Sequence, residues 1–115
     1  MTITLYGIKN CDTMKKARVW LEAHGLAYDF HDYKASGIDE AHLRAWAAQV
    51  GWLVLLNKAG TTFKALPDAD KTDLDEDKAI GLMMRQPSMI KRPVLDRDGG
   101  ITVGFKPDIY AGLFS

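Results

Sequence analysis

The sequence predicts an α/β protein in which a mixed sheet of about four strands carries a helical insertion between the second and third strands. Three observations lead to this fold class. The chain opens with a strand–loop–helix–strand pattern over residues 3–30, its middle is helical, and it ends with two strands and a helix. A length of 115 residues suits one core, so we expect residues 1–115 to form a single domain with the insertion at about 38–88.

The opening segment has the pattern of two strands separated by a helix. Residues 3–6 are short, apolar and rich in β-branched side chains, which is typical of a buried strand. A helix follows the loop at residues 7–12 and stops at Gly25, and its apolar residues lie at helical spacing: Met14, Ala17 and Leu21. Apolar and polar residues then alternate over 26–30, which predicts a second strand. Because strand–helix–strand crossovers are right-handed, the two strands are expected to be parallel.

The middle of the chain is predicted to be helical. One helix is expected after Asp39 and ends at Gly51, and another spans about 75–85 with Ile80, Met83 and Met84 facing inward.

Strand patterns return near the end. Residues 93–95 and 101–103 flank Asp98-Gly99, a strong signal for a two-residue hairpin. A last helix begins near Pro107 and is expected to bury Ile109, Tyr110 and Leu113. This order of elements is that of a thioredoxin-like fold with helices inserted in its middle.

Composition excludes several classes of function. Lys plus Arg equals Asp plus Glu at 15 each, so no overall positive field attracts nucleic acid. No apolar run approaches the roughly 20 residues that span a bilayer, so no membrane association is expected. The three histidines lack paired ligand spacing, and we expect no metal. A single cysteine and the absence of an export signal at the N-terminus favour a reducing cytoplasm.

Cys11 is the candidate catalytic residue. It lies in the loop before the first predicted helix, where free N–H groups and the positive end of the helix dipole stabilise a thiolate. Lys9 and Asn10 precede it and Lys15 lies in the next turn. Cations at a helix N-terminus oppose the helix dipole, and such a local violation often marks a functional site. The alternative is a buried, inert thiol.

The spacing after Cys11 indicates how the thiol is regenerated. Met14 stands where a dithiol oxidoreductase has its second cysteine, and the chain has no other thiol. The cycle therefore needs a mixed disulfide with an external thiol, for which glutathione is the abundant cytosolic candidate.

Arg92 and Pro93 form the second candidate element. In a thioredoxin-like fold the proline that opens the strand beside the cysteine loop is usually cis, which would direct Arg92 toward Cys11 as a forked donor for an anion. Lys106 precedes the last helix and could face the same anion or solvent. Asn57, in a loop that contains glycine, is a further candidate whose alternative is a solvated loop residue.

Four segments together resemble the arsenate reductase (ArsC) family, and most closely its Spx/YffB-like branch. The segments are residues 6–13, 55–58, 60–62 and 90–94, and the resemblance runs from Thr2 to about Phe114. It implies a thioredoxin-like domain with a helical insertion. It also implies a cysteine nucleophile, matched by Cys11, that attacks arsenate and is resolved by glutathione and glutaredoxin.

The resemblance also implies three arginines around the thiolate. Arg92 matches one, whereas the other two positions hold Asn57 and Lys106, so arsenate would be bound through fewer bidentate contacts. The YffB-like proteins are thought to act as glutathione-dependent thiol reductases.

The leading hypothesis is therefore a glutathione-dependent thiol/disulfide reductase with Cys11 as nucleophile. Arg92, Pro93, Lys106, Lys9, Asn10, Asn57 and Lys15 are the candidate residues for binding glutathione or substrate. Expected partners are glutathione and either glutaredoxin or an oxidised protein. The alternatives are an arsenate reductase, or a non-enzymatic regulator that binds RNA polymerase as in the Spx branch. Such regulators typically have a two-cysteine switch, which Met14 removes here.

Overall fold

The structure is a computed structural model that describes residues 1–114, and its backbone divides into two compact units. The first unit contains Met1–Asp32 and the chain from Arg92 onward, and the second contains Tyr33–Lys91. Every element between the second and third strands is helical, so the predicted helical insertion is confirmed. Single-domain behaviour of the whole chain stays a prediction. No helix within residues 1–114 is long and apolar enough to cross a membrane.

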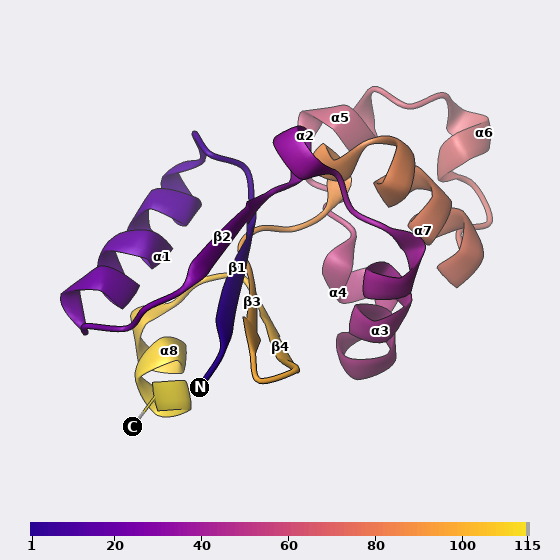
Figure 1. The fold of residues 1–115 in the computed structure, drawn as a ribbon. Coiled ribbons are helices and arrows are strands. Elements are labelled where there is room, and N and C mark those ends of the chain that lie inside the picture. The colour runs from indigo at the N-terminus through magenta and orange to yellow at the C-terminus, as the bar shows by residue number, and fades with distance from the viewer. Residues whose placement is uncertain (115) are drawn as a thin grey trace. The chain divides into compact units, whose positions relative to one another are not determined.

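The first unit is built on a mixed four-stranded sheet (Figure 1). Its strands are β1 (Ile3–Gly7), β2 (Asp29–Asp32), β3 (Val94–Arg97) and β4 (Gly100–Val103), in the order β2-β1-β3-β4. β1 is parallel to β2 and antiparallel to β3, and β3 is antiparallel to β4. The predicted mixed sheet and its parallel first pair are therefore confirmed.

The second strand begins later than the alternation at residues 26–30 predicts. Pairing with β1 starts at Asp29, opposite Thr4. The N–H of Leu26 instead donates to the Leu21 carbonyl at 3.0 Å, and the Leu26 side chain packs against the core. The first part of the apolar pattern thus belongs to the loop that follows α1 (Asp12–Ala23), because burial in a loop can give the same alternation as burial in a strand.

The hairpin is found where the sequence predicts it. Arg97 pairs with Gly100, which leaves a two-residue turn of Asp98 and Gly99 with φ of 52° and 91°. Two consecutive positive φ angles suit the right-handed twist of a hairpin, and Asp-Gly adopts them at little cost. The turn holds β3 antiparallel to β4.

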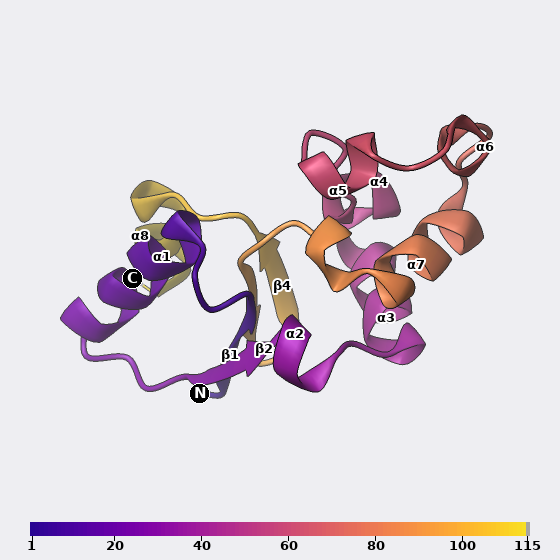
Figure 2. The same cartoon turned by 90° about the horizontal axis from the view of Figure 1, so that it is seen from above.

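Two helices cover one face of the sheet: α1 (Asp12–Ala23) and α8 (Pro107–Phe114) lie side by side on it in both ribbon views (Figures 1 and 2). Between these helices and the sheet lies a core of buried residues from β1, β3, α1 and α8: Ile3, Leu5, Met14, Ala17, Leu21, Leu95 and Tyr110. The prediction that Ile109 of α8 is buried is wrong. Ile109 is 47% exposed, because α8 turns Tyr110 rather than its neighbour toward the sheet.

The second unit consists of short helices around an apolar core. Its elements are α2 (Tyr33–Ser36), α3 (Glu40–Val50), α4 (Trp52–Leu55), α5 (Thr61–Lys64), α6 (Asp68–Lys71), α7 (Glu76–Arg85) and the 3-10 turn η1 (Pro87–Met89). Arg44 of α3 forms ion pairs with Glu76 and Asp77 at the start of α7, at 3.1 and 2.7 Å. The prediction that Met84 of α7 faces inward is wrong. Met84 is exposed, whereas Ile80 and Met83 are buried as expected.

Candidate functional site

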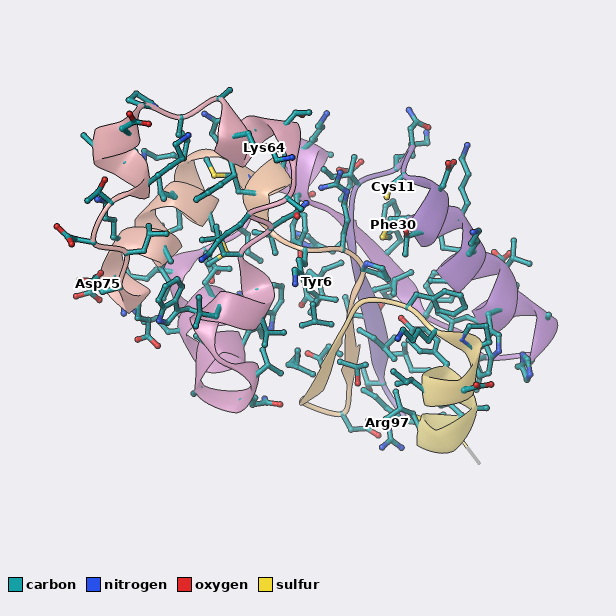
Figure 3. All side chains as sticks on the ribbon, turned by 180° about the vertical axis from the view of Figure 1, so that it is seen from behind. Tyr6, Cys11, Phe30, Lys64, Asp75 and Arg97 are labelled. Atoms are coloured by element: carbon teal, nitrogen blue, oxygen red, sulfur yellow. The ribbon has the colours of Figure 1, made fainter. Side chains whose placement is uncertain are left out.

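Cys11 is the N-cap of α1, at the end of the loop that leaves β1 (Figure 3). Its backbone is extended, with φ −95° and ψ 133°, and its carbonyl accepts the N–H of Lys15 at 3.0 Å. The side chain is partly buried and packs against the core of the first unit. The sulfur therefore occupies a defined position at the helix N-terminus while remaining accessible to a reactant.

The surroundings of the sulfur favour the thiolate. Burial alone would raise the pKa of the Cys11 thiol. The N–H of Met14, the side chain of Arg92 and the N–H of Thr13 act in the opposite direction as hydrogen-bond donors, and the Arg92 charge adds to them. The net result is a pKa below the ordinary value of a thiol.

Arg92 reaches Cys11 because of the strand that follows it. Val94, the first residue of β3, pairs with Tyr6 near the end of β1, so the residues just before β3 lie beside the loop that leads to Cys11. The Arg92-Pro93 peptide bond is cis, as expected from the sequence. Pro93 is buried, and its carbonyl accepts the N–H of Gly104 at 2.8 Å.

Gly7 determines how closely β1 approaches α1. A Cβ at this position would lie 2.2 Å from the sulfur and 2.7 Å from the terminal carbon of Met14, whose side chain is fully buried. Only a residue without a side chain fits at this distance. The sequence marks Gly7 only as the end of a strand, because the contact with Met14 depends on how the helix packs back onto the sheet.

The remaining predicted residues of the first unit are exposed. Lys9 and Asn10 lie in the loop before Cys11, and Lys15 lies in the first turn of α1. Lys106 stands just before α8, where its carbonyl accepts the N–H of Tyr110 at 3.1 Å. These side chains share a unit with Cys11, and their contribution to anion binding stays a prediction.

Asn57 lies in the second unit. Its N–H donates to the Met89 carbonyl at 2.7 Å, and a Cβ at Gly60 would come within 2.9 Å of its side-chain amide nitrogen. The local fold thus explains why a glycine closes this loop. A role for Asn57 in anion binding stays a prediction.

The described residues contain no group of three or more His, Cys, Asp or Glu side chains that could hold a metal ion.

Comparison with known proteins places the chain among relatives of similar length. The model of the ArsC family matches residues 6–113. An uncharacterised protein of Haemophilus influenzae is 42% identical, over 98% of this chain and 99% of its own length. The global transcriptional regulator Spx of Streptococcus mutans is 25% identical, over 92% of this chain and 78% of its own length.

Solved structures agree with the observed fold. A protein named YffB is 65% identical and superposes with a TM-score of 0.97, over 99% of this chain and 100% of its own. An arsenate reductase (ArsC) related protein from Brucella melitensis is 56% identical with a TM-score of 0.79, over 100% and 96% of the two chains. ArsC proteins have a thioredoxin-like fold, so the fold class predicted from the sequence is confirmed.

Proposed function

The chain belongs to the ArsC family, in its Spx/YffB-like branch, and from this premise we propose that it is a glutathione-dependent thiol/disulfide reductase with Cys11 as the nucleophile. The observation that carries the proposal is the position of Cys11 at the N-terminus of α1 beside Arg92, where helix N–H groups and the guanidinium lower the pKa of the thiol. The thiolate is the attacking form of a cysteine, and catalytic cysteines occupy partly exposed, electropositive positions such as this one.

The proposed first step is attack of the Cys11 thiolate on the glutathione sulfur of a mixed disulfide, RS–SG. A new S–S bond forms between Cys11 and glutathione, the original S–S bond breaks, and the substrate leaves as a thiolate that takes a proton from water. The N–H groups of Met14 and Thr13 stabilise the Cys11 thiolate before attack and when it is released again.

The proposed second step regenerates Cys11. Because the chain has no second cysteine, a second glutathione must attack the glutathionyl sulfur. This step yields oxidised glutathione and returns the Cys11 thiolate. The sum is RS–SG + GSH → RSH + GSSG: one free glutathione is consumed, and the glutathionyl group of the mixed disulfide supplies the other half of the oxidised glutathione.

Arg92 has a second role in this proposal. Glutathione carries two carboxylates, and the Arg92 guanidinium presents a fork of donors that suits a carboxylate. Lys106, Lys9, Lys15, Asn10 and Asn57 are the further candidates for anion binding. Pro93 is the candidate for contact with the backbone of a peptide-like ligand.

A coupled assay tests the proposal. The purified protein is mixed with glutathione, glutathione reductase, NADPH and the mixed disulfide of glutathione with 2-mercaptoethanol. We expect NADPH oxidation above the uncatalysed rate, loss of that activity in Cys11→Ser, and a single glutathione adduct on the wild-type protein by mass spectrometry. Circular dichroism checks that Cys11→Ser is folded. Turnover that survives in the folded Cys11→Ser protein contradicts the proposed mechanism.

A second candidate function is arsenate reduction, which the name of the 56% identical Brucella melitensis protein favours. The overall reaction converts arsenate and two glutathiones to arsenite, oxidised glutathione and water. Replacement of two family arginines by Asn57 and Lys106 argues against tight arsenate binding. The same coupled assay with arsenate and glutaredoxin decides the question, and a rate equal to the background excludes this function.

A further inference from the structure

A groove of about 500 Å³ lies between α1 and the segment that enters α8 in the first unit. Its lining comes from successive turns of α1 and from the segment that enters α8: Lys15, Lys16, Val19, Trp20, Ala23, His24, Phe105 and Pro107. The groove begins one turn beyond Cys11, since the carbonyl of Cys11 accepts the N–H of Lys15. Lys15, at this end of the groove, therefore lies one helical turn from the proposed nucleophile on the same helix.

The floor of the groove is rigid and aromatic. The ring of Trp20 stacks on His24 with centroids 3.8 Å apart and meets the edge of Tyr110 at 5.5 Å. Phe105 packs against the same Tyr110 ring at 4.7 Å and 90°. Because Tyr110 is fully buried, these contacts fix both rings before any ligand arrives.

Val19 lies on the groove with 63% of its side chain exposed, more than any other large apolar side chain in the helices and strands of the described residues. An exposed β-branched residue inside a helix contributes little to folding. An apolar side chain that completes an aromatic groove is instead typical of a surface that binds a partner.

The charged groups on the groove have one sign. Lys15 and Lys16 line the end nearest Cys11. No carboxylate is found among the described lining residues, although the whole chain is neutral. The groove thus complements a ligand with an apolar group and a nearby negative charge.

Glutathione does not fit this description, because it is polar and has no large apolar group. We propose that the groove binds the other half of the mixed disulfide, and that this half is a polypeptide with an acidic residue and a large apolar side chain near its oxidised cysteine. The inference rests on the proposed function and adds the class of substrate.

The geometry gives the spacing of these residues. Val19 is eight residues beyond Cys11, and a rise of 1.5 Å per residue places it about 12 Å along the helix axis. An extended chain covers about 3.3 Å per residue, so the apolar side chain should lie about four residues from the substrate cysteine. Lys15 and Lys16 are roughly half as far away, which places the acidic residue about two positions from that cysteine.

Kinetics with matched peptides test the proposal. Two glutathionylated probe peptides have Glu two positions and Phe four positions from the cysteine, one peptide on its N-terminal side and the other on its C-terminal side. In the matched control peptides Gln replaces Glu and Ser replaces Phe. We expect the better Glu/Phe peptide to have a KM at least about tenfold below that of its Gln/Ser counterpart. Val19→Asp should raise that KM about tenfold and leave turnover of the 2-mercaptoethanol disulfide unchanged. Equal KM values for the two kinds of peptide overturn the proposal.

A matched variant controls for the change of surface charge. Val54 is an exposed valine in a helix of the second unit, and Val54→Asp should leave all KM values unchanged. Lys16→Glu should raise the KM of the Glu/Phe peptide, and the effect should weaken as salt is added because the charges are exposed. Equal effects of Val19→Asp and Val54→Asp argue against a specific groove.

Binding without chemistry separates the two proposals. Fluorescence anisotropy of a dye-labelled Glu/Phe peptide is measured with Cys11→Ser protein and with the double variant Cys11→Ser/Val19→Asp. We expect binding to the first and about tenfold weaker binding to the second. If the protein turns over the small disulfide but does not bind the peptide selectively, the reductase proposal stands and the groove proposal is wrong. If the protein binds the peptide selectively but turns over no disulfide, the groove proposal stands and the reductase proposal is wrong. Binding of a small apolar dye without binding of the peptide excludes a polypeptide as the occupant.

Discussion

Replacing Gly7 with alanine should destabilise the first unit, because it adds a methyl group to a position that has no room. The new Cβ would lie 2.2 Å from the Met14 sulfur and 2.7 Å from its terminal carbon, whereas real Cβ atoms stay beyond about 3.0 Å from their neighbours. Met14 is fully buried and cannot move outward. Overpacking of a dense core costs about 1–3 kcal/mol, and we expect about 2 kcal/mol here because the side chain of Met14 is flexible enough to yield in part.

Urea unfolding followed by circular dichroism measures this change as a lower midpoint at an unaltered slope. The same variant should alter the rate of Cys11 alkylation, since the N–H of Met14 is one of the donors that lower the thiol pKa. Gly112→Ala is the matched control. It lies in α8 of the same unit with nothing within 4 Å of its added Cβ, so it should be neutral or stabilising by up to about 1 kcal/mol.

A double-mutant cycle isolates the cause. Met14→Ala removes the atoms that clash, so Gly7→Ala should cost clearly less in that background than in the wild type. If the two substitutions are additive, or if Gly7→Ala matches Gly112→Ala, then the close approach of β1 and α1 is not what requires glycine.

Three further predictions concern single groups. Arg92→Ala should slow alkylation of Cys11 at pH 6 by about tenfold, because a charged hydrogen bond contributes about 1.5–3 kcal/mol and the partial exposure of Cys11 reduces that contribution. Arg97→Ala is the control. If the alkylation rates of both variants depend on pH in the same way, Arg92 does not act on Cys11. Asp75→Ala should lower the free energy of unfolding by about 1 kcal/mol because the carboxylate caps α7 through a 2.8 Å hydrogen bond, which Asp75→Asn should largely retain. Tyr110→Phe should keep or raise stability, since its buried hydroxyl finds no hydrogen-bond partner in the described residues; a loss above about 1 kcal/mol contradicts this.

Local patterns predicted the parts of this fold that depend on neighbouring residues. The Asp98-Gly99 turn, the helix that ends at Gly51 and the start of α8 at Pro107 each follow from the backbone preferences of a few adjacent residues. The placement of Cys11 at a helix N-terminus is of the same kind, because strand, loop and helix follow one another directly. The proximity of Arg92 was inferred from a fold in which a proline precedes the strand beside the cysteine, and the structure brings the two side chains together.

Patterns failed where burial depends on distant partners. Leu26 alternates like a strand residue but packs at the end of α1, and Met84 and Ile109 have the spacing of core residues but face solvent. Periodicity identifies which residues are apolar, whereas the packing of one element on another decides which of them are covered.

The sequence by itself determined the candidate nucleophile, the lack of a second cysteine to resolve it and the order of strands and helices, because each depends on residue identity or on short-range backbone preference. Only the tertiary structure decided the electrostatic environment of Cys11, the need for glycine at position 7 and the groove that starts at Lys15. Each of these arises where segments far apart in the chain meet at distances of a few ångströms, and no local pattern encodes such distances.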